Sequence, residues 1–246
     1  MKEGHGYGLN GNTLKIIAAV SMLIDHIGVV LLPDVGFLRV LGRLAFPIYA
    51  YMIAEGCAHT KHRLRYFLTV FLLGAVCQTV YAIASDGTYM GILITFSMSI
   101  LLVYMLQAVK AAWTANEETV ARRILLTALF AAAVAGVYLF TCFVRIDYGF
   151  WGCMAPVFAS LFRAPRDAEA PLWRKLDCNT VHVLMLGVCL LILACVFGGI
   201  RFCALLAVPL LLLYSGKRGT ANLKYFFYIF YPAHLVLLEG IAFFLL

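Results

Sequence analysis

Long apolar segments separated by short polar ones make up most of the chain. A helix of about 20 apolar residues is long enough to cross the hydrocarbon core of a bilayer. The pattern predicts nine such helices, at residues 14–33, 38–57, 66–84, 90–108, 124–143, 148–162, 180–197, 200–214 and 225–246. The sixth and eighth are short for a complete crossing, so re-entrant or internal helices are an alternative there. We therefore expect one all-α, polytopic membrane domain over residues 1–246.

The composition strengthens this prediction. The chain is 64% hydrophobic and only 13% charged, about half the roughly 25% charge typical of soluble domains. A soluble fold of this size cannot bury so much apolar surface. The same composition excludes a nucleic-acid-binding domain, a disulfide-stapled secreted module and a disordered segment. The eight cysteines show neither CxxC nor His-paired spacing, so we expect them to pack as small apolar residues and predict no metal site.

The basic residues favour one orientation. With nine crossings, most of the 19 Lys and Arg residues fall on the same side as the N-terminus. The four on the other side are Arg39, Arg43, Arg145 and Arg201. Because Lys and Arg are enriched on the cytoplasmic side of membrane proteins, the N-terminus is predicted inside and the C-terminus outside. This topology also accounts for the net charge of +7 without a nucleic-acid partner.

Several ionisable residues lie where a span should be apolar. Asp25 and His26 are in the first span, Arg43 is in the second and His234 is in the last. Such residues are costly in a bilayer and are candidates for function, although a hydrogen bond between helices is the structural alternative. Arg43 must either pair with a carboxylate, for which Asp25 is the obvious candidate, or bind an anionic group when one arrives. Pro47 is expected to kink the second helix near Arg43.

Helical spacing places these residues at comparable depths. Lys15 and His26 are eleven residues apart, close to three turns, so they share a helix face about 16 Å apart along the axis. His234 lies about ten residues into the last span, at a depth near that of His26. Tyr228 and Tyr231, at i and i+3, are expected to hydrogen-bond a ligand or a histidine, with aromatic packing as the alternative.

Two polar segments at the span ends are further candidates. The cations Lys61, Arg63 and Arg65 lie between the second and third spans. They are either a topology signal or a cytoplasmic mouth that binds phosphate groups. Arg145 and Asp147 lie in an outer loop with the sequence RIDYGFWG. Its aromatic and glycine residues suit a lid or an entrance for substrate, and a surface ion pair is the alternative.

Together these residues suit acyl transfer. A neutral imidazole is matched to taking a proton from an amine or a hydroxyl, so His26 is expected to act as a base, oriented by Asp25 or by a group on another helix. Arg43 is placed to stabilise an oxyanion. Lys15 and the cluster at 61–65 would hold the phosphates of a cytoplasmic acyl-CoA. The acceptor would then reach the outer half of the membrane.

Two other classes of function use similar residues. A proton-coupled transporter needs the same residue types, but transporters often contain inverted repeats and the sequence shows no such symmetry. A non-catalytic factor of a conjugation or secretion machine is the third interpretation, and it would tolerate loss of both intramembrane histidines.

Five segments of the chain resemble the TraX family. They are TLKIIAAVSMLIDHIG, LRVLGRLAFPIYAYMIAEGCAHTKHRLRY, RIDYGFWG, LYSGKRG and KYFFYIFYPAHLVLL, within residues 13 to 240. The family is named for a conjugation protein that acetylates the N-terminus of pilin in the bacterial inner membrane. The chain is also similar, more distantly, to membrane acyltransferases that acetylate sugars and glycans. In those proteins an arginine precedes the catalytic histidine of the first span by eleven residues, and Lys15 and His26 hold these two places.

The resemblance implies a function and a set of site residues. It implies that His26 is catalytic, as general base or as acyl carrier, that Arg43 and His234 line the pocket, and that acetyl-CoA is the donor. The expected acceptor is a primary amine, either the N-terminus of a pilin-like protein or a small molecule, with a cell-wall or glycan hydroxyl second. It also implies a multi-pass protein of the bacterial inner membrane.

Overall fold

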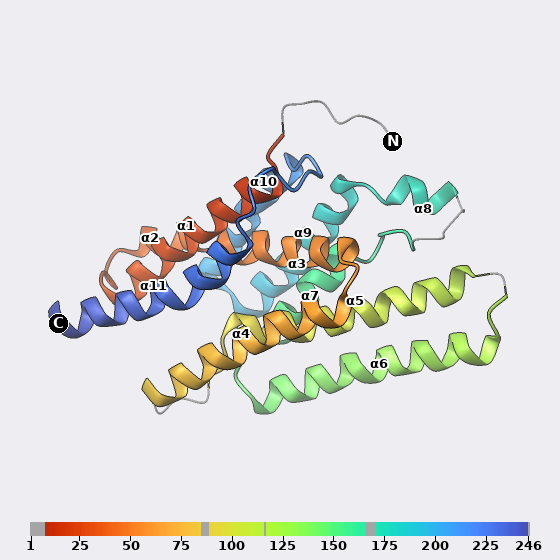
Figure 1. The fold of residues 1–246 in the computed structure, drawn as a ribbon, viewed down its shortest axis with the longest axis horizontal. Helices are drawn as coiled ribbons and strands as arrows, with labels where there is room; N and C mark the ends of the chain where they lie inside the picture. Colours follow the sequence, from red (N-terminus) through yellow and green to blue (C-terminus); the bar gives the residue numbers. More distant parts are fainter. Residues whose placement is uncertain (1–7, 85–88, 116, 166–170, 246) are drawn as a thin grey trace. The chain divides into compact units, whose positions relative to one another are not determined.

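The computed structural model describes residues 8–84, 89–115, 117–165 and 171–245, and it is built from helices (Figure 1). Within these ranges the only extended pairings are two isolated bridges, Leu9 with Tyr214 and Met90 with Ile146. Residue 246, the end of the last predicted span, lies outside the described residues. The helices are α1 (Gly11–Val30), α2 (Gly36–Gly42), α3 (Ala45–His59), α4 (Arg63–Ala84), α5 (Ile92–Thr114), α6 (Val120–Phe143), α7 (Gly149–Ala159), α8 (Pro171–Leu176), α9 (Asn179–Phe197), the 3-10 helix η1 (Gly199–Leu206), α10 (Ala207–Leu212) and α11 (Lys224–Leu245).

Each predicted span coincides with one helix or with two consecutive helices, which confirms the all-α class. Six segments of the described residues are long and apolar enough to cross a membrane, namely Gly11–Val30, Gly36–His59, Ile92–Thr114, Val120–Phe143, Asn179–Phe197 and Tyr225–Phe244. The predicted span at 66–84 is α4, and the two predicted short spans are the shorter apolar helices Gly149–Ala159 and Gly199–Leu212. The count of nine crossings and their orientation stay predictions.

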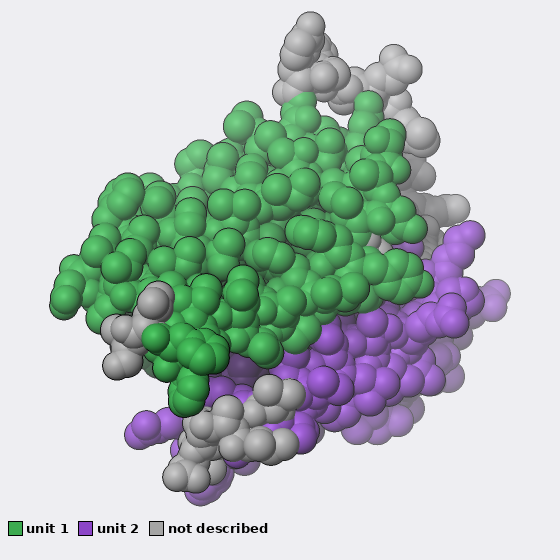
Figure 2. Space-filling model, turned by 60° about the vertical axis from the view of Figure 1, so that its left-hand side comes forward, with its two compact units in different colours: residues 1–52, 190–246 green, residues 53–189 purple. Residues whose placement is uncertain are grey.

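The chain divides into two compact units, which Figure 2 colours green and purple. Unit 1 contains residues 1–52 and 190–246, and unit 2 contains residues 53–189. Helices α3 and α9 each contribute residues to both units. The organisation of the whole chain as a single functional domain stays a prediction.

In unit 1, α1 and α11 begin at the same end and run in the same direction (Figure 1). The backbone amides of Gly11 and Asn12 donate to the carbonyls of Lys217 and Arg218 at 2.8 and 3.0 Å. The Asn12 side chain donates to the carbonyl of Ala221 at 2.6 Å, a few residues before α11 begins. The first and last long helices of the described chain are therefore parallel neighbours, tied together at their N-terminal ends.

A different face of α1 packs closely against α2. Ser21, Asp25 and Gly28 lie on this face because they are spaced at i, i+4 and i+7. The Ser21 hydroxyl donates to the carbonyl of Leu41 at 2.5 Å. At Gly28, an added Cβ would lie 2.9 Å from the Cβ of Leu38, closer than real Cβ atoms approach. The two helices thus come together at small residues, as helices in membranes commonly do.

The second predicted span is broken into α2 and α3 between Gly42 and Ala45. Pro47 has no amide hydrogen, so it cannot donate to the carbonyl of Arg43 four residues earlier. The helix turns tightly there, and the amide of Arg43 donates to the carbonyl of Val40 at 3.2 Å. The predicted kink at Arg43 is confirmed.

In unit 2, α5 packs against α4, α6 and α7, and a buried lysine ties α5 to the end of α7. The Lys110 ammonium donates to the carbonyls of Ser160 and Arg163, both at 2.8 Å, and approaches that of Leu161 at 3.4 Å. It also stands 5.7 Å from the centre of the Trp173 ring. A cation at the C-terminal end of a helix satisfies carbonyls that have no helical donor.

We predict that Gly42→Ala destabilises the protein, because a Cβ at this position would overlap the side chain of Asp25. Overpacking of this kind costs about 1–3 kcal/mol, which should appear as a lower midpoint of thermal unfolding in detergent. Gly36→Ala is the matched control on the same helix, because a Cβ there meets nothing within 4 Å. An equal drop for both variants would contradict the close contact between α1 and α2.

Candidate functional site

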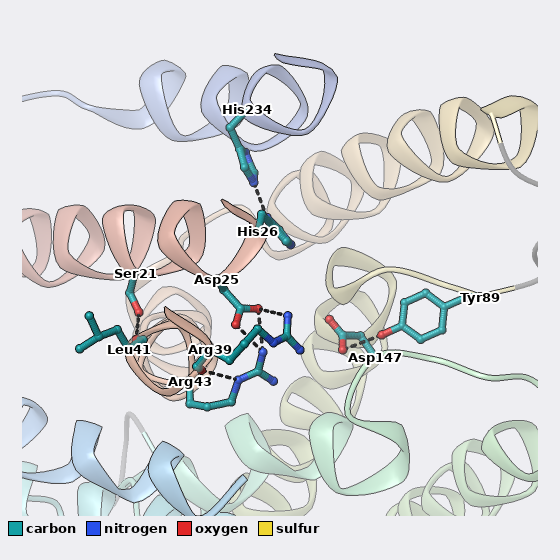
Figure 3. Close-up of polar contacts among 9 residues, drawn as sticks. All are labelled: Ser21, Asp25, His26, Arg39, Leu41, Arg43, Tyr89, Asp147 and His234. Atoms are coloured by element: carbon teal, nitrogen blue, oxygen red, sulfur yellow. Dashed lines mark hydrogen bonds and ion pairs between the residues drawn. The ribbon is translucent and has the colours of Figure 1, made fainter. Parts of the chain in front are cut away.

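Two intramembrane histidines meet in unit 1. Nδ1 of His26 on α1 lies 2.7 Å from Nε2 of His234 on α11 (Figure 3). The imidazole rings are 4.9 Å apart between centres and inclined by 20°. His234 is buried, whereas His26 is partly exposed. The sequence prediction that the two histidines share one depth is therefore confirmed.

The hydrogen bonds fix which ring nitrogens carry protons. Nδ1 of His234 lies 2.7 Å from the carbonyl of Phe230, which accepts only, so this nitrogen is the donor. In a neutral His234 ring, Nε2 is then the acceptor, and Nδ1 of His26 must donate to it. A neutral His26 consequently carries its lone pair on Nε2, the nitrogen that points away from His234. The arrangement thus leaves Nε2 of a neutral His26 as the nitrogen that can accept a proton.

Asp25 lies beside His26 in sequence but points to another helix, because consecutive side chains on a helix are about 100° apart. One terminal nitrogen of Arg43 lies 2.6 and 2.7 Å from the two carboxylate oxygens of Asp25 (Figure 3). Both side chains are largely buried, with exposed fractions of 15% for Asp25 and 10% for Arg43. The predicted Asp25–Arg43 pair is confirmed.

Arg39 is a third member of this ionic cluster, which was not predicted from the sequence. Its Nη1 lies 3.4 Å from Oδ2 of Asp25, and its carbonyl accepts from Nε of Arg43 at 3.3 Å. The i, i+4 spacing of Arg39 and Arg43 was the available signal, since it places both on one helix face. Within the cluster, two guanidinium groups thus share the Asp25 carboxylate on the helix that carries His26.

The two candidate tyrosines of α11 lie in different surroundings. Tyr231 stands edge-on to His234, with ring centres 5.8 Å apart, and Phe230 stacks on His234 at 5.1 Å. Tyr228, one turn earlier, interacts with the charge of Arg218 near the start of the helix. Tyr231 is thus the one that packs against the histidine pair.

The predicted donor-binding cations fall in both units. Lys15 is in unit 1, in the second turn of α1, close to Arg218. The other three are exposed residues of unit 2 around the start of α4, namely Lys61, Arg63 and Arg65. Arg63 stands over the Tyr104 ring, 5.3 Å from its centre.

In unit 2, Arg145 and Asp147 tie the start of α7 to the start of α5. The amide of Met90 donates to the carbonyl of Arg145, and the amide of Asp147 donates to the carbonyl of Met90, both at 2.9 Å. The Asp147 carboxylate accepts from the hydroxyl of Tyr89 at 2.7 Å (Figure 3). The next residue, Tyr148, has a φ of 59°, a left-handed conformation that turns the chain into α7. The contacts of this segment hold two helix ends together.

Two further polar contacts connect segments of unit 2, and the sequence did not predict them. Glu55 of α3 forms an ion pair with the largely buried Arg163. Nearby, Nε2 of His182 lies 3.1 Å from Oδ1 of Asp177. Burial alone would raise the pKa of the Asp177 carboxyl, but the hydrogen bond from His182 and the charge of Arg163 lower it below its usual value.

The fold and this histidine pair define an all-helical membrane protein with an oriented imidazole inside a bundle. The TraX protein family matches residues 10–242, nearly the whole chain, and the chain belongs to this family. No solved structure matches it.

Two curated relatives give the comparison more detail. One is the probable fimbrial assembly protein FimC, serogroup H1, of Dichelobacter nodosus. It is 25% identical over 249 residues, which cover 94% of this chain and 95% of the relative. The other is the uncharacterized protein RP591 of Rickettsia prowazekii (strain Madrid E), which is 42% identical over 38 residues, or 15% of each chain.

We predict that Asp25→Asn destabilises the protein, because it removes the negative charge that the guanidinium groups of both Arg39 and Arg43 contact. Breaking a buried ion pair from one side costs at most about 3–5 kcal/mol, and the partial exposure here reduces that value. Arg39→Gln should cost less, about 0.2–1 kcal/mol, because the Arg39 side chain is 32% exposed. Midpoints of thermal unfolding in detergent should therefore be lower for Asp25→Asn than for Arg39→Gln.

The double variant Asp25→Asn/Arg43→Gln tests the coupling directly. It should lose less stability than the two single losses combined, because each single change strands the partner. Strictly additive losses would show that the pair contributes little.

Proposed function

We propose that the protein is a membrane-embedded acetyltransferase that moves an acetyl group from acetyl-CoA to an amine. The observation that carries the proposal is the contact between His26 and His234, which holds one imidazole with its basic nitrogen directed away from its partner. Membership of the TraX family supports the same chemistry.

In this proposal His26 is the general base. As the amine nitrogen attacks the thioester carbon, Nε2 of His26 takes the proton that the amine loses. Nδ1–H of His26 keeps its hydrogen bond to His234, which steadies the imidazolium that forms. When the carbon–sulfur bond breaks, its electron pair goes to sulfur, and His26 returns the proton to that thiolate. The products are an amide and the free thiol, and His26 is neutral again.

The ionic cluster beside His26 supplies positive charge for the transition state. Asp25 balances one of the two guanidinium groups of Arg39 and Arg43 and holds Arg43 in place. The guanidinium groups favour the oxyanion that develops on the thioester oxygen. Asp25 therefore acts by positioning Arg43, whereas His234 acts by orienting His26.

The proposed acceptor is the N-terminal amine of a pilin-like protein, with a small amine or a hydroxyl as the alternative acceptor. The name of the D. nodosus relative, a probable fimbrial assembly protein, supports an acceptor of this kind.

We further propose nine crossings of the bacterial inner membrane, with the N-terminus in the cytoplasm. The parallel direction of α1 and α11 supports an odd number, because the first and last crossings can only be parallel if the chain ends on opposite sides. The six long apolar helices with α4 and the two shorter apolar helices together make nine segments.

The topology predicts that reporters fused to the two ends report opposite sides of the membrane. A C-terminal alkaline phosphatase fusion should be active, since that enzyme folds only outside the cytoplasm, whereas a C-terminal green fluorescent protein fusion should be dark when exported in unfolded form. Fusions after residue 115, in a segment rich in flanking Lys and Arg, serve as the cytoplasmic control. Activity of the phosphatase at both positions, or at neither, would contradict nine crossings.

The enzymatic proposal predicts that purified protein in nanodiscs releases CoA thiol from acetyl-CoA when an amine is added, and that His26→Ala abolishes this release. His182→Gln is the matched control, because His182 is likewise a histidine of a long apolar helix but lies in unit 2. It should keep most of its activity. All variants would first be compared by thermal unfolding to confirm that they are folded.

Variants of His234 test whether this residue orients His26 through a hydrogen bond or only packs against it. His234→Gln retains an oxygen that can accept from Nδ1 of His26 and should keep part of the turnover. His234→Leu removes the acceptor and should lose turnover by about 100-fold, the lower range for general-base catalysis. Equal activity of the two variants would contradict the orienting role of His234.

A non-catalytic assembly factor is the second candidate, and the name of the D. nodosus relative is the observation that favours it. This alternative predicts no thiol release by folded wild-type protein and unimpaired assembly of fimbriae with His26→Ala. The same set of variants thus decides between the two.

A further inference from the structure

Three cations gather at the N-terminal end of α1 in unit 1. Lys217 and Arg218, both exposed, lie on a loop whose carbonyls accept from the first amides of α1. Lys15 is one turn further along α1, close enough to Arg218 for the like charges to interact. Across the described ranges, none of the three is paired with a carboxylate. A cluster of unbalanced cations favours an anionic ligand.

Close packing holds the loop that carries Lys217 and Arg218 against the start of α1. Gly219 has a φ of 92°, and a Cβ there would lie 2.8 Å from Oδ1 of Asn10 and 2.9 Å from Nδ2 of Asn12. Asn10 in turn caps α1 by accepting from the amide of Thr13 at 2.9 Å. The loop therefore lies against the beginning of a 20-residue helix, whose partial positive charge adds to that of the cations.

The distance along α1 between the cation cluster and the histidine pair matches the length of one class of ligand. Lys15 and His26 share a face of α1 and are about 16 Å apart along its axis. A pantetheine arm has about 13 bonds between its phosphate and its sulfur. At the reach per bond of an extended backbone, roughly 1.2 Å, it spans about 16 Å. A donor whose phosphates lie at the cation cluster thus places its thioester at the depth of His26.

We propose that Lys15, Lys217 and Arg218 bind the phosphate groups of the acyl-CoA donor. This inference rests on the proposed acetyltransferase function and adds two residues, Lys217 and Arg218, to its donor site. The guanidinium of Arg218 offers paired donors to phosphate oxygens, and the two lysines act as point charges. The phosphate of an anionic lipid has the same chemistry, so the test must separate the two sources.

The test measures binding of CoA itself, without an acyl group, to wild-type protein and to Lys217→Gln/Arg218→Gln in nanodiscs of phosphatidylcholine. Both substitutions lie in an exposed loop outside the helices, so folding should be unaffected. We expect the dissociation constant for CoA to rise at least about tenfold in the double variant, since two charge-assisted contacts are lost. Pantetheine, which lacks the phosphates, should bind both proteins equally.

The control variant is Arg122→Gln/Lys175→Gln, which removes the same charge from exposed positions of unit 2. Its dissociation constant for CoA should change less than about twofold, because screened charges in bulk solvent contribute little. An equal loss of affinity for CoA in both double variants would show that the effect comes from the net charge of the protein, and it would overturn the proposal.

Other outcomes separate this inference from the proposed function. CoA that binds the wild type and the Lys217/Arg218 double variant equally would overturn the inference and leave the acetyltransferase proposal standing. No CoA binding by the folded wild type would overturn both. In a parallel arm with phosphatidylglycerol, loss of bound anionic lipid by the double variant, with unchanged affinity for CoA, would assign the cluster to lipid and overturn the inference.

Discussion

The ion pair between Asp25 and Arg43 is the interaction on which the packing of unit 1 depends. An arginine is always charged, so within a bundle it must lie beside a carboxylate. The pair directs the Asp25 face of α1 toward the break between α2 and α3, where Gly42 leaves room for the carboxylate. Because His26 is the next residue, its side chain is turned about 100° away, toward α11. One ionic contact thus sets the direction of the imidazole.

The parallel arrangement of α1 and α11 brings the cation cluster and the histidine pair onto the same pair of helices. Their N-terminal ends are joined by backbone hydrogen bonds and carry the cations, and the histidines meet further along. In an antiparallel pair, His26 and His234 could still have met, but the loop with Lys217 and Arg218 would have been at the opposite end from Lys15. Shared direction, rather than contact alone, relates the cation cluster to the histidines.

Much of this arrangement was predictable from the sequence, because it depends on spacing along single helices. The apolar runs predicted the helices, the turn count predicted the depths of His26 and His234, and Pro47 predicted the break at Arg43. What was missed depends on contacts between distant segments. In the sequence, Arg163 and Lys110 had no role beyond their contribution to the predicted orientation. In the structure Arg163 pairs with Glu55, and Lys110 donates to carbonyls at the end of α7. A sequence shows that a charge is costly in a bilayer, but it does not show which helix satisfies it.

The histidine pair also explains why the carboxylate is not the partner of the imidazole. In a medium of low dielectric constant, a carboxylate that oriented His26 would be lost to the ion pairs with Arg39 and Arg43. His26 is instead oriented by uncharged groups: it donates to His234, which donates in turn to the carbonyl of Phe230. Asp25 then pairs with the arginines, and the imidazole of His26 is oriented without a carboxylate. Separating the two tasks on different faces of α1 avoids a buried charge that has no partner.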